Sequence, residues 1–161
     1  MRPSLDLPST LNSSCEQSLT SAPPIVLDTN AVLDWLLFDD PAMSGLAAKI
    51  TSGQVRWIAT AAMRSELEHV LGRGLAARRG SDTVNIPGRW ARHCLECPPA
   101  PPAPAHLRCT DTDDQKFLDL ALASGARWLV SRDRALLKLG RRAARQGMTI
   151  VMPARWRFNE G

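Results

Sequence analysis

Several common features are missing from this sequence of 161 residues, and each absence excludes a class of protein. No run approaches 18 consecutive apolar residues, so a transmembrane helix is not expected. The first residues hold no continuous apolar stretch, so a secretory signal is not expected and we predict a cytoplasmic location. The glycine-rich phosphate-binding patterns of P-loop and dinucleotide-binding proteins are also missing, so nucleotide-dependent chemistry is not indicated.

Lysine is scarce as well, and arginine supplies most of the positive charge: of the 20 basic residues, 17 are Arg and three are Lys. The charge is unevenly placed. Residues 1–40 hold six acidic residues and one basic residue, whereas residues 127–157 hold nine basic residues and one acidic residue. Guanidinium groups make paired contacts with phosphates, so a nucleic-acid partner is one interpretation of this region and an ordinary solvated surface is the other.

The composition divides the chain into three parts. Residues 1–22 are rich in serine and threonine without an apolar period, and we predict a disordered leader there. Residues 23–153 are predicted to form one folded domain, followed at 154–161 by a basic C-terminal tail in which Trp156 is exposed. Five prolines within residues 98–104 predict a stiff connector rather than a helix or a central strand.

Short apolar runs alternate with amphipathic segments along the folded part, which is typical of an α/β domain with a mostly parallel sheet. Strands are expected at residues 25–27, 56–60, 106–109, 128–131 and 148–152. Helices are expected at residues 31–38, 43–50, 62–71, 114–124 and 135–144, with further helical character at 90–95. Tryptophans within these elements are expected to pack in the core rather than to stack on bases, namely Trp35, Trp57 and Trp128.

Four acidic residues fall where a parallel sheet concentrates chemistry. Asp28 and Asp133 each come just after an expected strand, and Asp114 opens a helix just after the short strand expected near Cys109. Ligand sites of open α/β sheets lie beyond the carboxyl ends of the strands, so these three residues are expected to converge. Glu66 lies three residues after the apolar Met63, so its side chain is predicted to point inward from the same helix face.

Each of these acidic residues also has an ordinary structural interpretation. Asp28, Asp114 and Asp133 could cap helices, and Glu66 could pair with an arginine. Four such coincidences at one edge of a sheet are less expected than one acidic pocket. Clustered carboxylates repel one another and need cations, and oxygen ligands favour Mg²⁺ or Mn²⁺ over zinc.

The segments that carry the four acids resemble the four acidic motifs of PIN-domain ribonucleases. In chain order they are IVLDTN (25–30), RSEL (64–67), DTDDQKFL (111–118) and LVSRD (129–133). They occur in the order of the family, and the resemblance spans about residues 24–153. The acidic stretch at 111–118 is similar to the subgroup described as toxins of type II toxin–antitoxin systems.

The resemblance implies a PIN-like three-layer α/β/α fold with a five-stranded parallel sheet and a Mg²⁺-dependent (or Mn²⁺-dependent) endoribonuclease site. The residues it implies as catalytic and metal-binding are Asp28, Glu66, Asp114 and Asp133. It implies Asp111 as an auxiliary metal ligand. Polar neighbours that would hold waters or orient the carboxylates are Thr29, Asn30 and Ser131.

The partners expected for such a protein are an RNA substrate, a cognate antitoxin protein and a second copy of the chain, and no membrane. Basic residues near the last acidic motif are candidates to bind the flanking phosphates, namely Arg132, Arg134, Arg141 and Arg142. They could equally be plain surface charge.

Other interpretations remain open at this stage. Cys94, Cys97, His106 and Cys109 have the spacing of a structural zinc site, or they are four unrelated residues of a variable stretch. A phosphotransfer domain also places an Asp after its first strand, but the segment DTN lacks the second acid that a hydrolase of that kind needs. A PIN-like protein that binds RNA or acts as a scaffold without catalysis is the main alternative, and the four intact acids argue against it.

Overall fold

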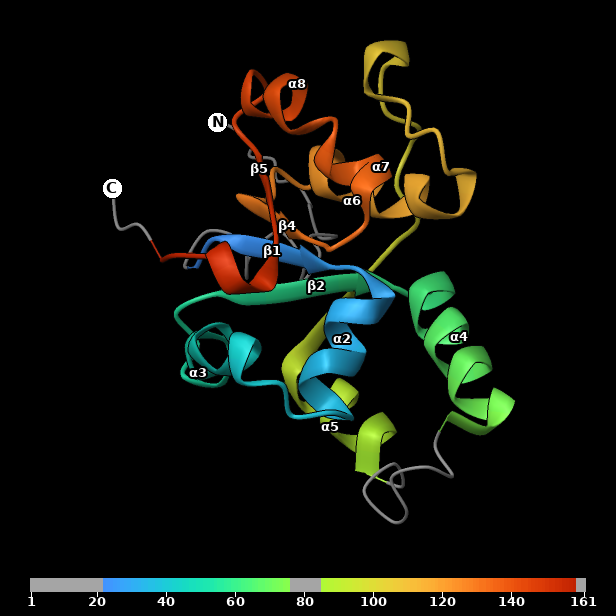
Figure 1. Cartoon of the computed structure of the whole chain (residues 1–161), viewed down its shortest axis with the longest axis vertical. Helices are drawn as coiled ribbons and strands as arrows, with labels where there is room; N and C mark the ends of the chain where they lie inside the picture. The colour runs from blue at the N-terminus through green and yellow to red at the C-terminus, as the bar shows by residue number, and fades with distance from the viewer. Residues whose placement is uncertain (1–21, 76–84, 159–161) are drawn as a thin grey trace, which may run out of the picture.

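The computed structural model describes residues 22–75 and 85–158 (Figure 1). Five strands form one parallel sheet: β1 (Pro24–Leu27), β2 (Arg56–Thr60), β3 (Cys94–Cys97), β4 (Trp128–Val130) and β5 (Thr149–Val151), in the order β3-β2-β1-β4-β5. Apart from Ala22, the predicted leader lies outside the described residues, as do residues 159–161 of the predicted tail.

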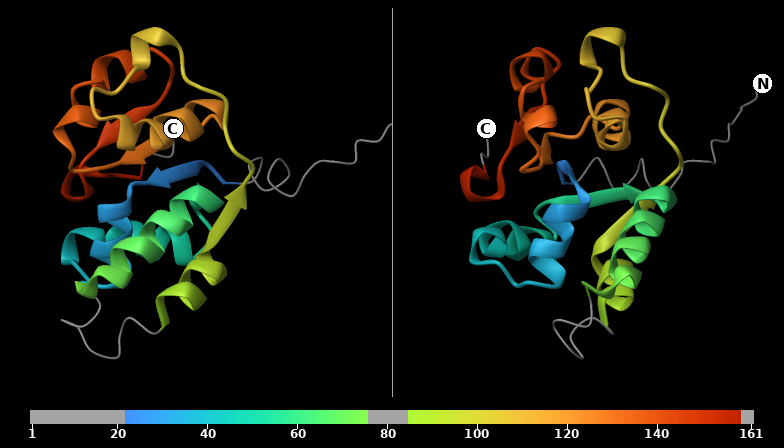
Figure 2. Two further views of the ribbon diagram at one scale, coloured as in Figure 1. Left: turned by 90° about the vertical axis from the view of Figure 1, so that its right-hand side faces the viewer. Right: turned by 45° about the vertical axis from the view of Figure 1, so that its right-hand side comes forward.

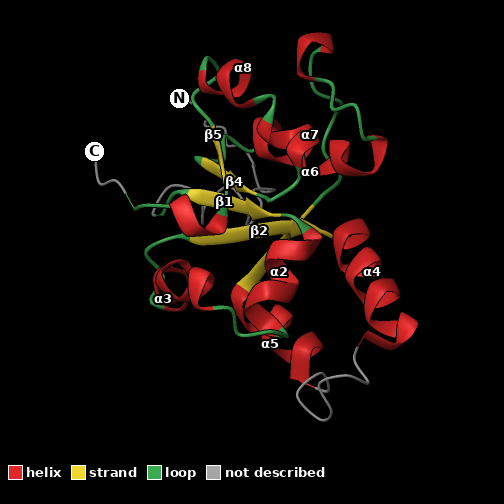
Figure 3. Cartoon of the chain, in the orientation of Figure 1, coloured by secondary structure: helices red, strands yellow, loops and turns green. Residues whose placement is uncertain are grey.

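Helices cover both faces of the sheet, which gives three layers (Figures 2 and 3). On one face lie α2 (Thr29–Leu36), α3 (Ser44–Thr51), α4 (Ala61–Val70) and α5 (Ile86–His93), and on the other lie α6 (Gln115–Ala123), α7 (Arg134–Leu137) and α8 (Gly140–Ala144). The chain changes face because it first runs outward from β1 to β3 and then returns to β4 on the other side of β1. With right-handed crossovers, that reversal moves the helices to the opposite face. The predicted α/β/α fold with a five-stranded parallel sheet is confirmed.

Short helical turns join these elements. The 3₁₀ turns are Pro41–Met43, Ala105–Leu107, Thr112–Asp114 and Pro153–Arg155, and a π-helical turn, Leu71–Leu75, follows α4. Among the described residues, no helix is long and apolar enough to cross a membrane.

The centre of the core lies between β1, β2 and the helices of the first face. Every residue of β1 is buried, which is what a strand covered on both faces requires. Trp57 of β2 has no solvent exposure, and its ring centre lies 5.5 Å from that of Trp35 and 4.8 Å from that of Trp90. Trp35, Trp57 and Trp128 are all buried, so their predicted role in the core is confirmed.

The expected strand at 106–109 is wrong. The third strand is β3, which pairs with β2 from Trp57 opposite Cys94 to Thr60 opposite Cys97. Its sequence, CLEC, lacks the β-branched run of a central strand, because β3 lies at the edge of the sheet and only Cys97 is buried. The helical character expected at 90–95 belongs to α5, which ends at His93.

Two expectations near the C-terminal end are also corrected. The single helix expected at 135–144 is divided into α7 and α8, the second of which begins at Gly140, a poor helix former. Trp156 was expected to be exposed, but it is buried, with 6% of its surface accessible. Its ring packs edge-on against that of Trp128, with the ring centres 5.3 Å apart. Phe158, two residues later on the same side of an extended segment, lies 6.2 Å from Trp128. These two aromatic rings pack against Trp128 in β4.

Candidate active site

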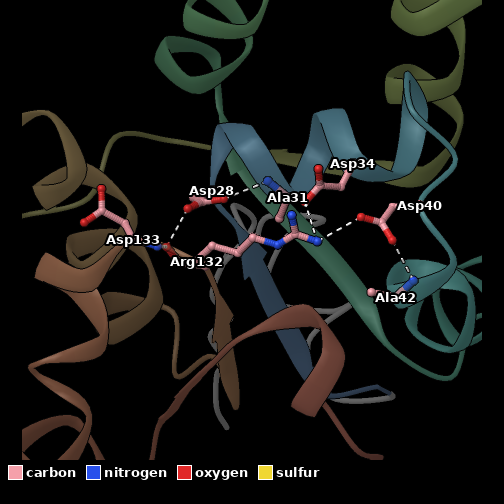
Figure 4. Close-up of polar contacts among 8 residues, drawn as sticks. Asp28, Ala31, Asp34, Asp40, Ala42, Arg132 and Asp133 are labelled. Atoms are coloured by element: carbon pink, nitrogen blue, oxygen red, sulfur yellow. Dashed lines mark hydrogen bonds and ion pairs between the residues drawn. The ribbon is translucent and has the colours of Figure 1, made fainter.

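Asp28 lies where β1 ends and α2 begins. Its Oδ1 accepts a hydrogen bond of 2.8 Å from the backbone N–H of Ala31, so it caps the helix, and its Oδ2 accepts one of 2.5 Å from the Ser131 hydroxyl. Figure 4 shows the Asp28 carboxylate directed at Ala31. The side chain is buried, and this burial raises the pKa of Asp28 to about 6 against the opposing effect of its two hydrogen bonds. Helix capping and membership of an acidic site are therefore compatible here.

Ser131 joins the ends of the two central strands. Its hydroxyl donates to Asp28 and accepts a hydrogen bond of 2.9 Å from the backbone N–H of Asp133. The side chain is fully buried, so water does not compete for either bond. β1 and β4 flank the position where the strand order reverses, which is where open α/β sheets bind their ligands.

Three carboxylates gather beside this junction. One ligand oxygen from each of Asp111, Asp114 and Asp133 lies within 4.8 Å of the others. Asp114 ends the 3₁₀ turn that precedes α6, and Asp133 caps α7 by accepting a hydrogen bond of 2.7 Å from the N–H of Ala135. The connection from β3 to α6 and the connection from β4 to α7 thus bring acidic residues from separate parts of the sequence together.

Among the residues that the structure describes, no basic side chain forms an ion pair with these three carboxylates. Oδ2 of Asp114 is buried and receives no hydrogen bond from any described residue. Burial first, and then a hydrogen bond to Asp133, raise the pKa of Asp114 to about 7, and the same hydrogen bond lowers the pKa of Asp133. The Asp28 charge also contributes to the raised pKa of Asp114, so Asp28 belongs to the same acidic centre. An unpartnered buried oxygen beside two other carboxylates fits a divalent cation that prefers oxygen ligands.

Glu66 contacts two residues that do not belong to the three-carboxylate group. Its Oε2 accepts a hydrogen bond from the Thr29 hydroxyl, and its Oε1 forms an ion pair with the Lys116 ammonium. Glu66 is half-buried, and it is not part of the three-carboxylate group. Lys116 was not predicted from the sequence, although its place two residues after Asp114 in the DTDDQKFL motif is a signal that it lies beside the acids.

The four arginines expected to bind phosphate divide into two kinds. Arg132 is committed within the protein: its Nη2 lies 2.9 Å from Asp40 Oδ2 and 3.3 Å from Asp34 Oδ2, the second contact without hydrogen-bond alignment (Figure 4). This ion pair and the N–H of Ala42 hold the pKa of Asp40 below its usual range, with the N–H as the larger cause. The other three, on α7 and α8, are exposed like Arg132 but form no ion pair among the described residues: Arg134, Arg141 and Arg142. Arg142 donates a hydrogen bond of 3.3 Å to the backbone carbonyl of His106. Asn30 is exposed as well.

The structure does not bring the zinc residues together. Cys94 and Cys97 lie three residues apart on β3, so their side chains point to opposite faces of the sheet and their Cα atoms are about 10 Å apart. Within residues 22–75 and 85–158, the aspartate group described above is the one set of three or more metal-ligating side chains in mutual reach. The CxxC spacing therefore lies on the edge strand β3 and does not form a zinc site with His106 and Cys109.

Comparison with known proteins bears on the same stretch of chain. A family model described as PIN domain matches residues 24–135, well over half of the sequence. The matched stretch contains all the acidic residues of the site, from Asp28 to Asp133. No match to a curated protein was found.

Proposed function

This chain belongs to the PIN-domain family, a nuclease-type fold whose members generally depend on a divalent metal, and we propose that it is a Mg²⁺- or Mn²⁺-dependent endoribonuclease. The observation that supports this most is the meeting of Asp111, Asp114 and Asp133 at the switch point of the sheet, with a buried oxygen of Asp114 that receives no hydrogen bond from the described residues. If Asp114 and Asp133 served only as helix caps, there would be no reason for three carboxylates to lie together.

The proposed roles follow from the contacts of each side chain. Asp114 and Asp133, with Asp111, would hold the metal, which when bound lowers the pKa of a water and neutralises charge on the leaving oxygen. Asp114 gives up its proton when the metal binds, because a ligating carboxylate must be ionised. Asp28 adds negative charge behind them, and Ser131 fixes Asp28 relative to the backbone of Asp133.

We further propose RNA as the substrate and a toxin–antitoxin pair as the biological setting, with a cognate antitoxin and a second copy of the chain as protein partners. The similarity of residues 111–118 to the toxin subgroup supports this setting. The exposed Arg134, Arg141 and Arg142 lie on the connection that follows Asp133 and can contact the phosphates of a bound strand. Arg132 is not included, because Asp34 and Asp40 already neutralise it.

A cleavage assay on single-stranded RNA with Mg²⁺ or Mn²⁺ tests the proposal. Asp114→Asn removes a metal-binding charge, and we expect it to lower the cleavage rate by at least about 100-fold. Asp113→Asn is the matched control, because that neighbouring side chain is exposed and lies outside the three-carboxylate group. Equal rates in wild type and Asp114→Asn would refute the site. Binding of RNA without any cleavage by wild type would favour the non-catalytic RNA-binding or scaffold alternative.

A further inference from the structure

Lys116 stands between the two parts of the acidic site. Its ammonium pairs with Glu66 of α4 and donates a hydrogen bond of 2.5 Å to the backbone carbonyl of Asp113, inside the turn that carries Asp114. Lys116 itself belongs to the first turn of α6, on the opposite face of the sheet from α4. The Lys116 ammonium therefore connects α4 and α6, which lie on opposite faces of the sheet.

The Lys116–Glu66 ion pair lowers the number of carboxylates that remain available to bind a metal. One oxygen of Glu66 is occupied by Lys116 and the other by the Thr29 hydroxyl. The Lys116 ammonium and the Glu66 carboxylate are each about a third exposed or less, with 29% and 32% of the side-chain surface accessible. The remaining carboxylates, Asp111, Asp114 and Asp133, have no such cation among the contacts of the described residues.

We propose that the Lys116 ammonium takes the place of a second cation in this site, so that the centre binds one divalent ion. That ion would be held by Asp111, Asp114 and Asp133, and Glu66 would hold Lys116 rather than a metal. The inference rests on the proposed function in taking Mg²⁺ or Mn²⁺ as the ion. In this arrangement Lys116 is a positioning residue that also presents a positive charge where the phosphate backbone of a substrate would lie.

The number of bound Mn²⁺ ions per chain tests this directly, measured by titration calorimetry and by the decrease of the free Mn²⁺ signal in electron paramagnetic resonance. We expect wild type to bind one ion. Lys116→Met keeps the length of the side chain but removes its charge, which frees Glu66, and we expect a second, weaker ion. The double variant Lys116→Met with Glu66→Gln should return to one ion, and Lys116→Arg, which keeps the charge, should stay at one.

Glu66→Gln alone provides a second arm that does not depend on the folding of the Lys116 variants. We expect it to bind one Mn²⁺ with an affinity within about threefold of wild type, because a metal ligand or its outer support would cost about 10–100-fold. Two ions on wild type, or loss of the single ion in Glu66→Gln, would overturn the proposal. Lys116→Met that folds and still binds one ion would overturn it as well.

The proposed nuclease activity is tested separately, because none of these titrations contains RNA. Wild type that binds one Mn²⁺, with the Lys116 and Glu66 variants behaving as expected, but that cleaves no RNA would refute the nuclease and leave the role of Lys116 intact. Cleavage that depends on Asp114, together with two ions on wild type, would support the nuclease and refute the proposed role of Lys116.

Discussion

The two sides of the acidic site are built in different ways. On the strand side, Asp28, Ser131 and Asp133 are short side chains at the ends of β1 and β4, and each is fixed by a bond that involves a backbone N–H. On the helix side, Glu66 and Lys116 are long, partly exposed side chains whose contact is an ion pair between α4 and α6. Both sides carry charge, but only the first is tied into the sheet.

The difference suggests two roles: the strand side fixes the geometry of the site, and the helix side supplies charge. Short side chains on strand ends have little rotamer freedom to lose, so they can hold a reacting centre within the narrow tolerance that catalysis needs. Long side chains that meet at the surface keep more freedom, and exposed ion pairs contribute only about 0–1 kcal/mol. We therefore expect changes on the strand side to affect catalysis far more than changes on the helix side, which should mainly alter charge.

The largest effect is expected for Asp28→Asn, which should lower RNA cleavage by at least about 100-fold, the usual loss when a preorganised electrostatic group is removed. The fold should survive. The amide oxygen can still accept the hydrogen bond from Ala31, and removing a charge that is 4% exposed relieves a desolvation cost. Cleavage rates with Mg²⁺ and a thermal melt of the metal-free protein provide the check. Wild-type rates in this variant would remove Asp28 from the site.

A second pair of variants compares the two sides directly. Ser131→Ala leaves both Asp28 Oδ2 and the N–H of Asp133 without their partner, and we expect cleavage to fall by about 10–100-fold. Thr29→Val removes the matching hydroxyl from Glu66, but Lys116 still holds that carboxylate. Its effect should stay within about fivefold, the factor that corresponds to about 1 kcal/mol. Equal losses in the two variants, measured at saturating RNA and metal, would contradict the division into a geometric and an electrostatic side.

The strand side is also the side that the sequence could predict. Asp28 and Asp133 follow apolar runs that are recognisable as buried strands, and parallel strands necessarily bring their carboxyl ends to one edge. The predictions for Asp28 and Asp133 depend only on local sequence and on a general property of parallel sheets. Asp114 was placed at the same edge because a strand was expected just before it, at 106–109, but no strand forms there. It reaches the site on the 3₁₀ turn Thr112–Asp114 instead.

The helix side and the sheet edge depend on partners that local sequence does not reveal. Glu66 was expected to face inward because of its spacing from Met63, but nothing near it in sequence indicates that Lys116, fifty residues later, holds its carboxylate. Arg132 was expected to bind phosphate, and its commitment to Asp40 depends on how the α2–α3 connection folds back. The edge strand β3 has no apolar alternation, because only its last residue is buried.

The buried carboxyl of Asp114, on the turn before α6, should make stability depend on pH. The pKa of Asp114 is raised to about 7, so the folded protein binds a proton that the unfolded chain releases near pH 4. The metal-free protein should therefore lose stability as pH rises from about 4 to about 7, since the folded state binds more protons in this window. Asp133 and Asp40, whose pKa values are lowered, act in the opposite direction but only below about pH 4.

Melting temperatures in EDTA across this window measure the effect. Asp114→Asn is the matched variant, and its melting temperature should fall less between pH 4 and 7 than that of wild type. His93, whose pKa is lowered by burial, is unchanged in both proteins and so does not affect the comparison. Mn²⁺ should raise the melting temperature of wild type at pH 7 more than that of Asp114→Asn. Parallel curves for the two proteins would show that Asp114 carries an ordinary carboxylate.

The smallest effect should distinguish Arg132, which is ion-paired, from the arginines of α7 and α8, which form no ion pair among the described residues. In the cleavage-deficient Asp28→Asn background, Arg141→Ala should flatten the dependence of log K for single-stranded RNA on log salt by about 0.7, because one phosphate contact and its released counterions are lost. Arg132→Ala should leave that slope unchanged, since Asp34 and Asp40 neutralise this guanidinium whether or not RNA is bound. The loss in Arg141→Ala should be the same for unrelated RNA sequences, because phosphate contacts carry no sequence information. If Arg132→Ala flattens the slope and Arg141→Ala does not, RNA runs over the β4–α7 connection beside Asp133, and the Asp34–Arg132–Asp40 contacts must open when it binds.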